Sequence, residues 1–165
     1  MRNILVSFVA LAATGCVIEH NSDPHPDGSI SEPVIPRAGS WYYAEITPVS
    51  NTCGAQIGQA ENGSFAIDQT SATGFRVLPQ DGSDPFLCSL SGSAFNCPDR
   101  AAGSRDLGTI DATVYYRATA HGTFSNPIRA TGSQQATVTC MGTQCNALGV
   151  TFPCNFSVNY VIAGA

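Results

Sequence analysis

The C-terminal end of the chain carries the pattern that most constrains its fold. Between Phe152 and Ile162, apolar side chains occupy every second position, and mostly polar residues lie between them. A period of two places one set of side chains on one face of a β-strand, whereas a helix requires a period of 3.6. The same alternation recurs over 135–140 and 110–116. The sequence therefore predicts strands, not helices, for this part of the chain.

Further strand-sized segments lie upstream and are separated by Gly, Ser, Asn, Asp and Pro: 41–49, 64–68, 74–78 and 119–124. No stretch has sustained helical periodicity. Many short strands with turn residues between them are typical of sandwiches and barrels. We therefore predict one all-β domain over residues 39–165, an antiparallel sandwich or small up-and-down barrel of about eight strands.

The first sixteen residues have the features of an export signal. Arg2 precedes an apolar run over 4–13, which is too short to span a bilayer as a helix, and 13–15 then place small side chains before Cys16. Small residues running into a cysteine resemble the lipobox of bacterial lipoproteins. The resemblance implies that the signal is removed, that Cys16 is acylated, and that the lipid anchors the chain to a membrane. An ordinary secretory signal is the alternative.

The segment after Cys16 predicts a tether in the bacterial envelope. Residues 17–38 are rich in proline, serine and aspartate, a composition typical of disorder. In Gram-negative lipoproteins an aspartate directly after the cysteine favours the inner membrane, so Val17 favours the outer membrane, on its periplasmic or surface side. The chain has a net charge of −5, and all its basic residues are arginines. An acidic chain with few basic residues is not expected to bind nucleic acid or anionic lipid headgroups. The lipid on Cys16 is therefore the expected contact with the membrane.

One hairpin can be predicted residue by residue. Gly92 and Ser93 suit a two-residue type II′ turn, because glycine tolerates a positive φ at the first position. Pairing outward from this turn aligns Cys88 with Cys97 as a non-hydrogen-bonded pair, where the backbones are close enough for a disulfide. We therefore predict a Cys88–Cys97 disulfide.

The other four cysteines of the domain allow three pairings: Cys53, Cys140, Cys145 and Cys154. An even set in an exported chain favours disulfides, and no Cys-x-x-Cys pair indicates zinc. Cys140 and Cys154 are expected on the inward face of the last two strands. In a closed meander the first strand lies beside the last, which brings Cys53 near the loop that holds Cys145. Our leading prediction is Cys140–Cys154 with Cys53–Cys145, and the other pairings stay open.

Candidate catalytic residues are few. His121 is the one histidine of residues 39–165, and no G-x-S-x-G motif marks a nucleophilic serine. Glu45, Asp68 and Asp111 lie in candidate strands, but their spacing does not bring two together, as glycoside hydrolysis requires. There is no phosphate-binding glycine loop. We therefore predict no catalytic residues, no metal and no cofactor.

Aromatic residues are the remaining candidates for a binding site. Alternation places adjacent aromatics on opposite faces of a strand, so one face can meet a ligand or partner while the other packs. We take Trp41, Tyr42 and Tyr115 as possible binding residues, with core packing as the alternative. The opening Gly39-Ser40-Trp41 also resembles the Gly-x-Trp start of lipocalins, eight-stranded barrels that hold small hydrophobic molecules. That resemblance implies a packing role for Trp41 at a closed barrel end.

The sequence thus favours a non-catalytic binding or interaction module of the envelope, whose partner is a protein or a polymer. A lipocalin-like carrier of a small apolar ligand is one alternative, and a hydrolase is another. A carrier requires an internal cavity, whereas an interaction module requires a filled core and an exposed apolar patch.

Overall fold

The computed structural model describes residues 32–55, 57–58 and 63–165. All of these residues belong to one compact unit. The predicted signal with Cys16, and residues 17–31 of the predicted tether, lie outside the described residues.

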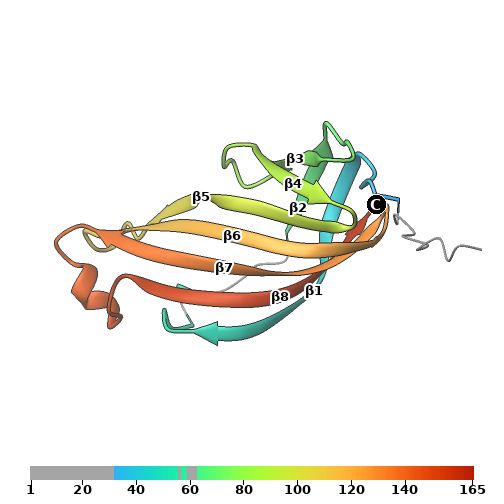
Figure 1. The fold of residues 1–165 in the computed structure, drawn as a ribbon. Coiled ribbons are helices and arrows are strands. Elements are labelled where there is room, and N and C mark those ends of the chain that lie inside the picture. The colour runs from blue at the N-terminus through green and yellow to red at the C-terminus, as the bar shows by residue number, and fades with distance from the viewer. Residues whose placement is uncertain (1–31, 56, 59–62) are drawn as a thin grey trace, which may run out of the picture. The chain divides into compact units, whose positions relative to one another are not determined.

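The described fold consists of antiparallel strands and one short 3₁₀ helix: β1 (Gly39–Asn51), β2 (Ser64–Asp68), β3 (Gly74–Pro79), β4 (Phe86–Ser91), β5 (Ala94–Asp106), β6 (Thr113–Asn126), β7 (Arg129–Met141), η1 (Cys145–Leu148) and β8 (Cys154–Gly164). Each strand pairs with the next, and β1 pairs with β8, so the sheet closes into an up-and-down barrel (Figure 1). The all-β prediction is confirmed, and of the two architectures expected the structure has the barrel.

Unequal strand lengths open one side of this barrel. The short strands β2, β3 and β4 lie beside only one end of the long strands, which we call the closed end (Figure 1). Among the described residues, β1 after Tyr43 pairs only with β8, and β5 after Cys97 pairs only with β6. The far halves of β1 and β5 are therefore sheet edges that border a gap in the strand pairing. We call this gap the side window.

The alternating apolar residues face inward and form two core clusters. The first fills the closed end around Trp41, which is 1% exposed and packs edge-to-face on Phe124 with ring centroids 5.9 Å apart. The second lies toward the far end, where Val114 and Val138 are fully buried. The predicted inward face of the last strand is confirmed from Cys154 on, where alternate residues are all buried: Cys154, Phe156, Val158, Tyr160 and Ile162. Phe152, in contrast, precedes the strand and is only partly buried.

Residues 34–37, which we call the strap, pack on the closed end although they belong to the predicted tether. Pro36 is buried, and Val34 contacts the closed-end cluster. The carbonyl of Arg37 accepts a hydrogen bond from the indole Nε1 of Trp41 at 2.9 Å. The folded unit therefore begins earlier in the chain than predicted.

Several strands run further than the alternation predicts, and β7, for example, begins at Arg129 and not at 135. β6 begins only at Thr113, three residues after the predicted start at 110, and continues through 117–118 into the candidate strand 119–124. β5 extends to Asp106, although Pro98 and several charged residues follow its hairpin. The register of β5 against β6 shifts after Cys97 and again after Ala101. These irregularities allow β5 to continue past a proline.

The hairpin at Gly92 and Ser93 forms as predicted. Gly92 has a φ of 60°, and the pairing places Leu90 opposite Phe95. The Cys88–Cys97 disulfide is present, with Cα atoms 4.2 Å apart. Both predictions are confirmed.

The other two predicted disulfides are wrong, because the structure pairs Cys53 with Cys154 and Cys140 with Cys145. β1 does lie beside β8, as expected. The β1–β8 ladder ends with Asn51 opposite Phe156, so the next residues of the chain bring Cys53 to Cys154 itself. Cys140 has passed the end of β8, whose first residue already pairs with Val138, and it therefore bonds within the following loop.

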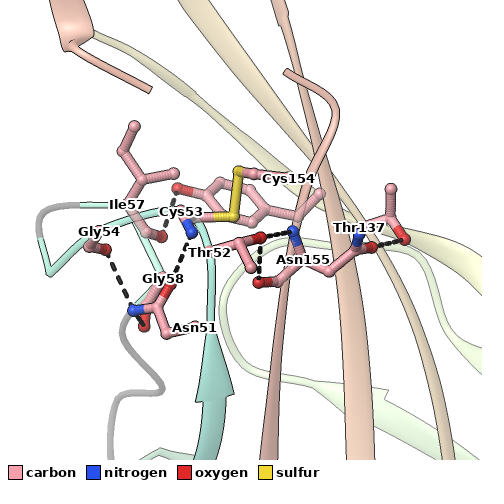
Figure 2. The surroundings of a disulfide bond; sticks show 10 residues. Asn51, Thr52, Cys53, Gly54, Ile57, Gly58, Thr137, Cys154 and Asn155 are labelled. Carbon is pink, nitrogen blue, oxygen red and sulfur yellow. Dashed lines mark hydrogen bonds between the residues drawn. A yellow bond between two sulfur atoms is a disulfide. The ribbon is translucent and has the colours of Figure 1, made fainter. Parts of the chain in front are cut away.

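Hydrogen bonds surround the Cys53–Cys154 disulfide and fix β1 to β8 beyond the last strand pair (Figure 2). The side chain of Asn51 accepts from the N–H of Cys53 at 2.8 Å and donates to two carbonyls later in the loop. The N–H of Thr52 donates to the carbonyl of Asn155 at 2.8 Å. The loop after β1 is thereby folded back against the start of β8.

Candidate functional site

A cavity of about 680 Å³, partly open to solvent, lies between the two core clusters and reaches the side window. Tyr43 and Phe65 line it from the closed-end cluster, and Tyr116 and Phe156 line it from the far-end cluster. Its rim includes residues 103–105 at the window edge of β5. Small-molecule sites in proteins generally have volumes of about 300–1,000 Å³. The cavity is therefore large enough for a small-molecule ligand.

Small residues occupy most of the inward positions in the middle of β6 and β7. Successive inward positions of these two strands carry, with one exception, only alanine or glycine: Ala118, Ala120 and Gly122, opposite Ala136, Gln134 and Gly132. A Cβ atom added at Gly132 would lie 2.7 Å from the hydroxyl oxygen of Tyr160. The Tyr160 side chain thus lies against the glycine backbone, and a Cβ atom added at Gly122 would likewise lie 2.7 Å from the Phe95 ring, so large side chains from other strands fill these two positions.

A β-bulge in β5 determines which charged residue faces this cavity. Between Cys97 and Arg100, three residues of β5 span the distance of two residues of β6. An unbulged strand would turn Asp99 inward, because alternate residues share a face. The bulge turns Arg100 inward, and Asp99 lies outside, where it pairs with Arg117 at 2.6 Å.

Arg100 has few partners inside the barrel. Its guanidinium lies 3.7 Å from the centroid of the Phe86 ring, and Nη1 donates to the carbonyl oxygen of Ala118 at 3.2 Å. Among the described residues, no carboxylate lies within 4.0 Å of it. Burial lowers the pKa of Arg100 below its ordinary value, and nearby groups, first Tyr43 and then others including Asp81, oppose that effect. The guanidinium nevertheless carries its charge at neutral pH.

Two buried tyrosines, Tyr43 and Tyr160, lie near Arg100. Their rings meet edge-to-face with centroids 5.6 Å apart. Burial raises the pKa of both phenols above the ordinary value, although the positive charge of Arg100 lowers each pKa somewhat. Both therefore stay neutral at physiological pH and present O–H donors. The hydroxyl of Tyr160 donates to the carbonyl oxygen of His121 at 3.5 Å, whereas the hydroxyl of Tyr43 has no hydrogen-bond partner among the described residues.

The structure does not bring the three predicted binding aromatics together. Trp41 belongs to the closed-end core, in agreement with its packing alternative. Tyr42 and Tyr115 are 46% and 41% exposed on β1 and β6, and neither lines the cavity. Their chain neighbours Tyr43 and Tyr116 line the cavity instead. Adjacent aromatic residues thus do lie on opposite faces of each strand, as predicted, but the residues that face the cavity are the ones that we had not selected.

A second hollow, of about 500 Å³, lies on the outer face of β6, β7, β8 and β1. There Oγ of Ser133 lies 2.9 Å from Nε2 of His121, its cross-strand partner. A nucleophilic serine requires a histidine that a third group orients. Among the described residues, no carboxylate hydrogen-bonds to His121. The pair is a contact between paired strands, in a hollow that Glu45 also lines.

The three carboxylates considered for glycoside hydrolysis have separate surroundings. Asp68 accepts two hydrogen bonds from Arg76, at 2.7 and 2.6 Å, which lower the pKa of its carboxyl. Asp111 accepts from the hydroxyl and N–H of Thr143, which lower its pKa in the same way. Glu45 lines the outer hollow. In the part of the chain that the structure describes, no group of three His, Cys, Asp or Glu side chains is placed to hold a metal.

Arg100 is the cavity residue that sequence reasoning missed. Regular alternation from Cys97 places Asp99, not Arg100, on the inner face. Pro98 is the available signal, because proline inside a strand lacks a donor for the ladder and marks edges or bulges. A bulge at Pro98 reverses the alternation that follows.

No helix within the described ranges is long and apolar enough to cross a membrane. Comparisons of the chain with protein-family models, with curated proteins and with solved structures find no match.

Proposed function

We propose that this chain is an exported, lipid-anchored binding protein that holds a small molecule inside its barrel without reacting with it. The cavity of about 680 Å³ is the observation that carries this proposal. A carrier requires interior space lined by apolar side chains, whereas a module that binds through its surface needs only a packed core. The space between the two clusters favours the carrier.

The outer surface supports the same choice. Large exposed apolar side chains of the described residues come from the strap, a turn and four different strands: Ile35, Tyr42, Val49, Leu87, Tyr115, Ile128 and Met141. Single exposed apolar residues are normal on soluble domains. The interior is the more distinctive feature of this barrel.

Export and anchoring are supported by the cysteines. Three disulfides are typical of proteins that fold in an oxidising compartment. They use the six cysteines after Cys16, which leaves Cys16 for the lipid that the lipobox resemblance implies. Metabolic labelling with an alkyne analogue of palmitate in a bacterial host tests this anchor. Label should enter the full chain and be lost in Cys16→Ser, and equal labelling of both would contradict acylation at Cys16.

Extraction of bound molecules tests the carrier. The full chain is purified from a bacterial envelope fraction, denatured in organic solvent, and its extract is analysed by mass spectrometry. We expect one compound class in near-stoichiometric amount. Ala102→Phe is the matched control, because Ala102 lines the cavity and a larger side chain there reduces its volume. An extract that matches that of Ala102→Phe would overturn the carrier and favour binding through the outer face.

A further inference from the structure

We infer that the cavity takes a carboxylate amphiphile, a molecule with an apolar body and one carboxylate head, and that Arg100 binds the head. This inference rests on the proposed carrier function and names its ligand class. The carboxylate site and the space for the apolar body are argued separately below.

The first argument is the incomplete set of contacts around Arg100. A cation withdrawn from water costs free energy unless a counter-charge or hydrogen bonds replace the water. Arg100 has one carbonyl and one aromatic ring as partners, although a guanidinium has five N–H donors. A carboxylate would accept two of these donors in the parallel geometry that suits a guanidinium. The protein thus supplies one half of an ion pair inside the cavity.

Among the described residues Arg105 and Arg129 also lack an ion pair, but both side chains are exposed to water, whereas Arg100 is partly buried. Arg76 and Arg117 each have a carboxylate at 2.6 Å, from Asp68 and Asp99. Asp99 is the chain neighbour of Arg100, yet the bulge sends it to the outer face. The acid nearest in sequence is therefore unavailable to Arg100, and a ligand can take its place.

The second argument is the polarity of the cavity wall around Arg100. Tyr43 adds a neutral phenol that can donate to the same carboxylate, and Gln134 adds an amide. Among the described residues that line the cavity, Arg105 lies at the rim and Asp81 is the one carboxylate, so these charged residues favour an anion. The whole chain is acidic, with a charge of −5, and its overall charge does not explain this local positive excess.

The rest of the wall suits an apolar body. Inward side chains from β1, β2 and β8 line the cavity without hydrogen-bonding groups: Ile46, Phe65, Phe156 and Val158. Such a wall gains free energy by excluding water from an alkyl or ring system. One charged end and one apolar end in the same cavity select a ligand with both.

Calorimetric titration with dodecanoate and with 1-dodecanol, both below their aggregation limits, tests the inference. The protein used is 32–165, which holds the closed barrel, both clusters and all three disulfides in one compact unit. At about pH 8 dodecanoate is ionised, and the two probes differ only in their head. We expect dodecanoate to bind at least about tenfold more tightly than the alcohol.

Two arginine variants locate the head. Arg100→Gln should weaken the binding of dodecanoate by about tenfold or more and change the affinity for dodecanol by no more than about twofold. Arg129→Gln is the matched control, since it removes the same charge from an exposed side chain outside the cavity. Arg129→Gln should leave the affinity for both probes unchanged. Each variant is checked for three disulfides by mass before titration.

Distinct results would overturn the inference and the carrier function. If Arg100→Gln binds dodecanoate as tightly as the unaltered barrel, Arg100 is not the head site and the inference fails. Loss of both probes in Ala102→Phe would then still support the cavity as their binding place. If neither probe binds the unaltered barrel, the inference also fails, and the extraction experiment decides the carrier function independently.

Discussion

Asp99 and Arg100 are consecutive in the chain, and their side chains lie on opposite sides of the barrel wall. Asp99 pairs with Arg117 outside at 2.6 Å, whereas Arg100 lies inside, 3.7 Å from the centroid of the Phe86 ring. The separation comes from the bulge between Cys97 and Arg100. Backbone register, not composition, therefore places a positive charge in the interior.

Arg100→Met should not destabilise the empty barrel. The substitution removes a poorly paired buried cation and keeps a flexible apolar stem, so we expect the free energy of unfolding to stay equal or rise by up to about 1 kcal/mol. Urea unfolding followed by the fluorescence of Trp41, the single tryptophan, measures it. As a control, Phe124→Ala in the closed-end core should lose about 3–5 kcal/mol. A loss above about 2 kcal/mol in Arg100→Met would show that Arg100 mainly supports the fold.

Removal of the Cys53–Cys154 disulfide should lower the free energy of unfolding more than removal of the Cys140–Cys145 disulfide. Cys53 and Cys154 are separated by 101 residues, and Cys140 and Cys145 by 5. The chain-entropy model gives a loss of about 4–5 kcal/mol for the first pair and about 2 kcal/mol for the second when both cysteines become alanine. Urea unfolding of the two double variants gives the comparison. Equal losses would mean that loop closure does not control their contribution.

A chain that starts at Gly39 should be less stable than one that starts at Glu32. The shorter chain lacks the strap, so it exposes part of the closed-end core and leaves the indole N–H of Trp41 without its acceptor on Arg37. We expect a loss of about 2–4 kcal/mol from these two effects. Thermal and urea unfolding of both chains provide the test. If their stabilities agree, residues 34–37 act as tether after all.

Gly132→Ala should destabilise the barrel through the neighbouring strand and Tyr160. The new methyl group would clash with the backbone carbonyl oxygen of His121 and would lie 2.7 Å from the Tyr160 hydroxyl oxygen, so both the backbone and the ring must shift. Overpacking of this kind costs about 1–3 kcal/mol. Gly63→Ala is the control, because nothing lies within 4 Å of its added Cβ, and it should stay within about 0.5 kcal/mol. Similar results for both glycines would argue against close packing at Gly132.

Stability should fall in alkaline solution because of Tyr43 and Tyr160. Burial raises the pKa of both phenols in the folded chain. Below about pH 10 both are neutral whether the chain is folded or unfolded, so their contribution is complete. Above that pH the unfolded chain ionises first, and each phenol lowers the free energy of unfolding by up to about 1.4 kcal/mol per pH unit. The double variant Tyr43→Phe with Tyr160→Phe should reduce the fall in the free energy of unfolding with rising pH. If urea unfolding at several pH values gives the same fall for this variant, the two phenols are not its cause.

Local periodicity predicted much of the barrel. The features that it did not predict depend on the register between strands that are far apart in the chain. Alternation places Phe156 and Tyr160 inward, and the turn at Gly92 fixes the Cys88–Cys97 register, since each depends on neighbours along the chain. The partner of Cys53 depends on where the β1–β8 ladder ends, which no short segment encodes.

The cavity residues show the same limit. Tyr43 follows from the alternation that buries Trp41, whereas Arg100 requires knowledge that a bulge interrupts β5. Empty space is likewise a property of several strands together, because residues of β1, β2, β5, β6, β7 and β8 line the cavity.

The bond between Cys53 and Cys154 turns most of the barrel into a covalent ring, which the peptide chain and one pair of sulfur atoms close. A protease that cuts one loop between these residues produces two chain ends but no separate fragment. The strands on either side of the cut stay tethered and in register. A single nick in this protein is thus a local event, visible as two bands only after reduction.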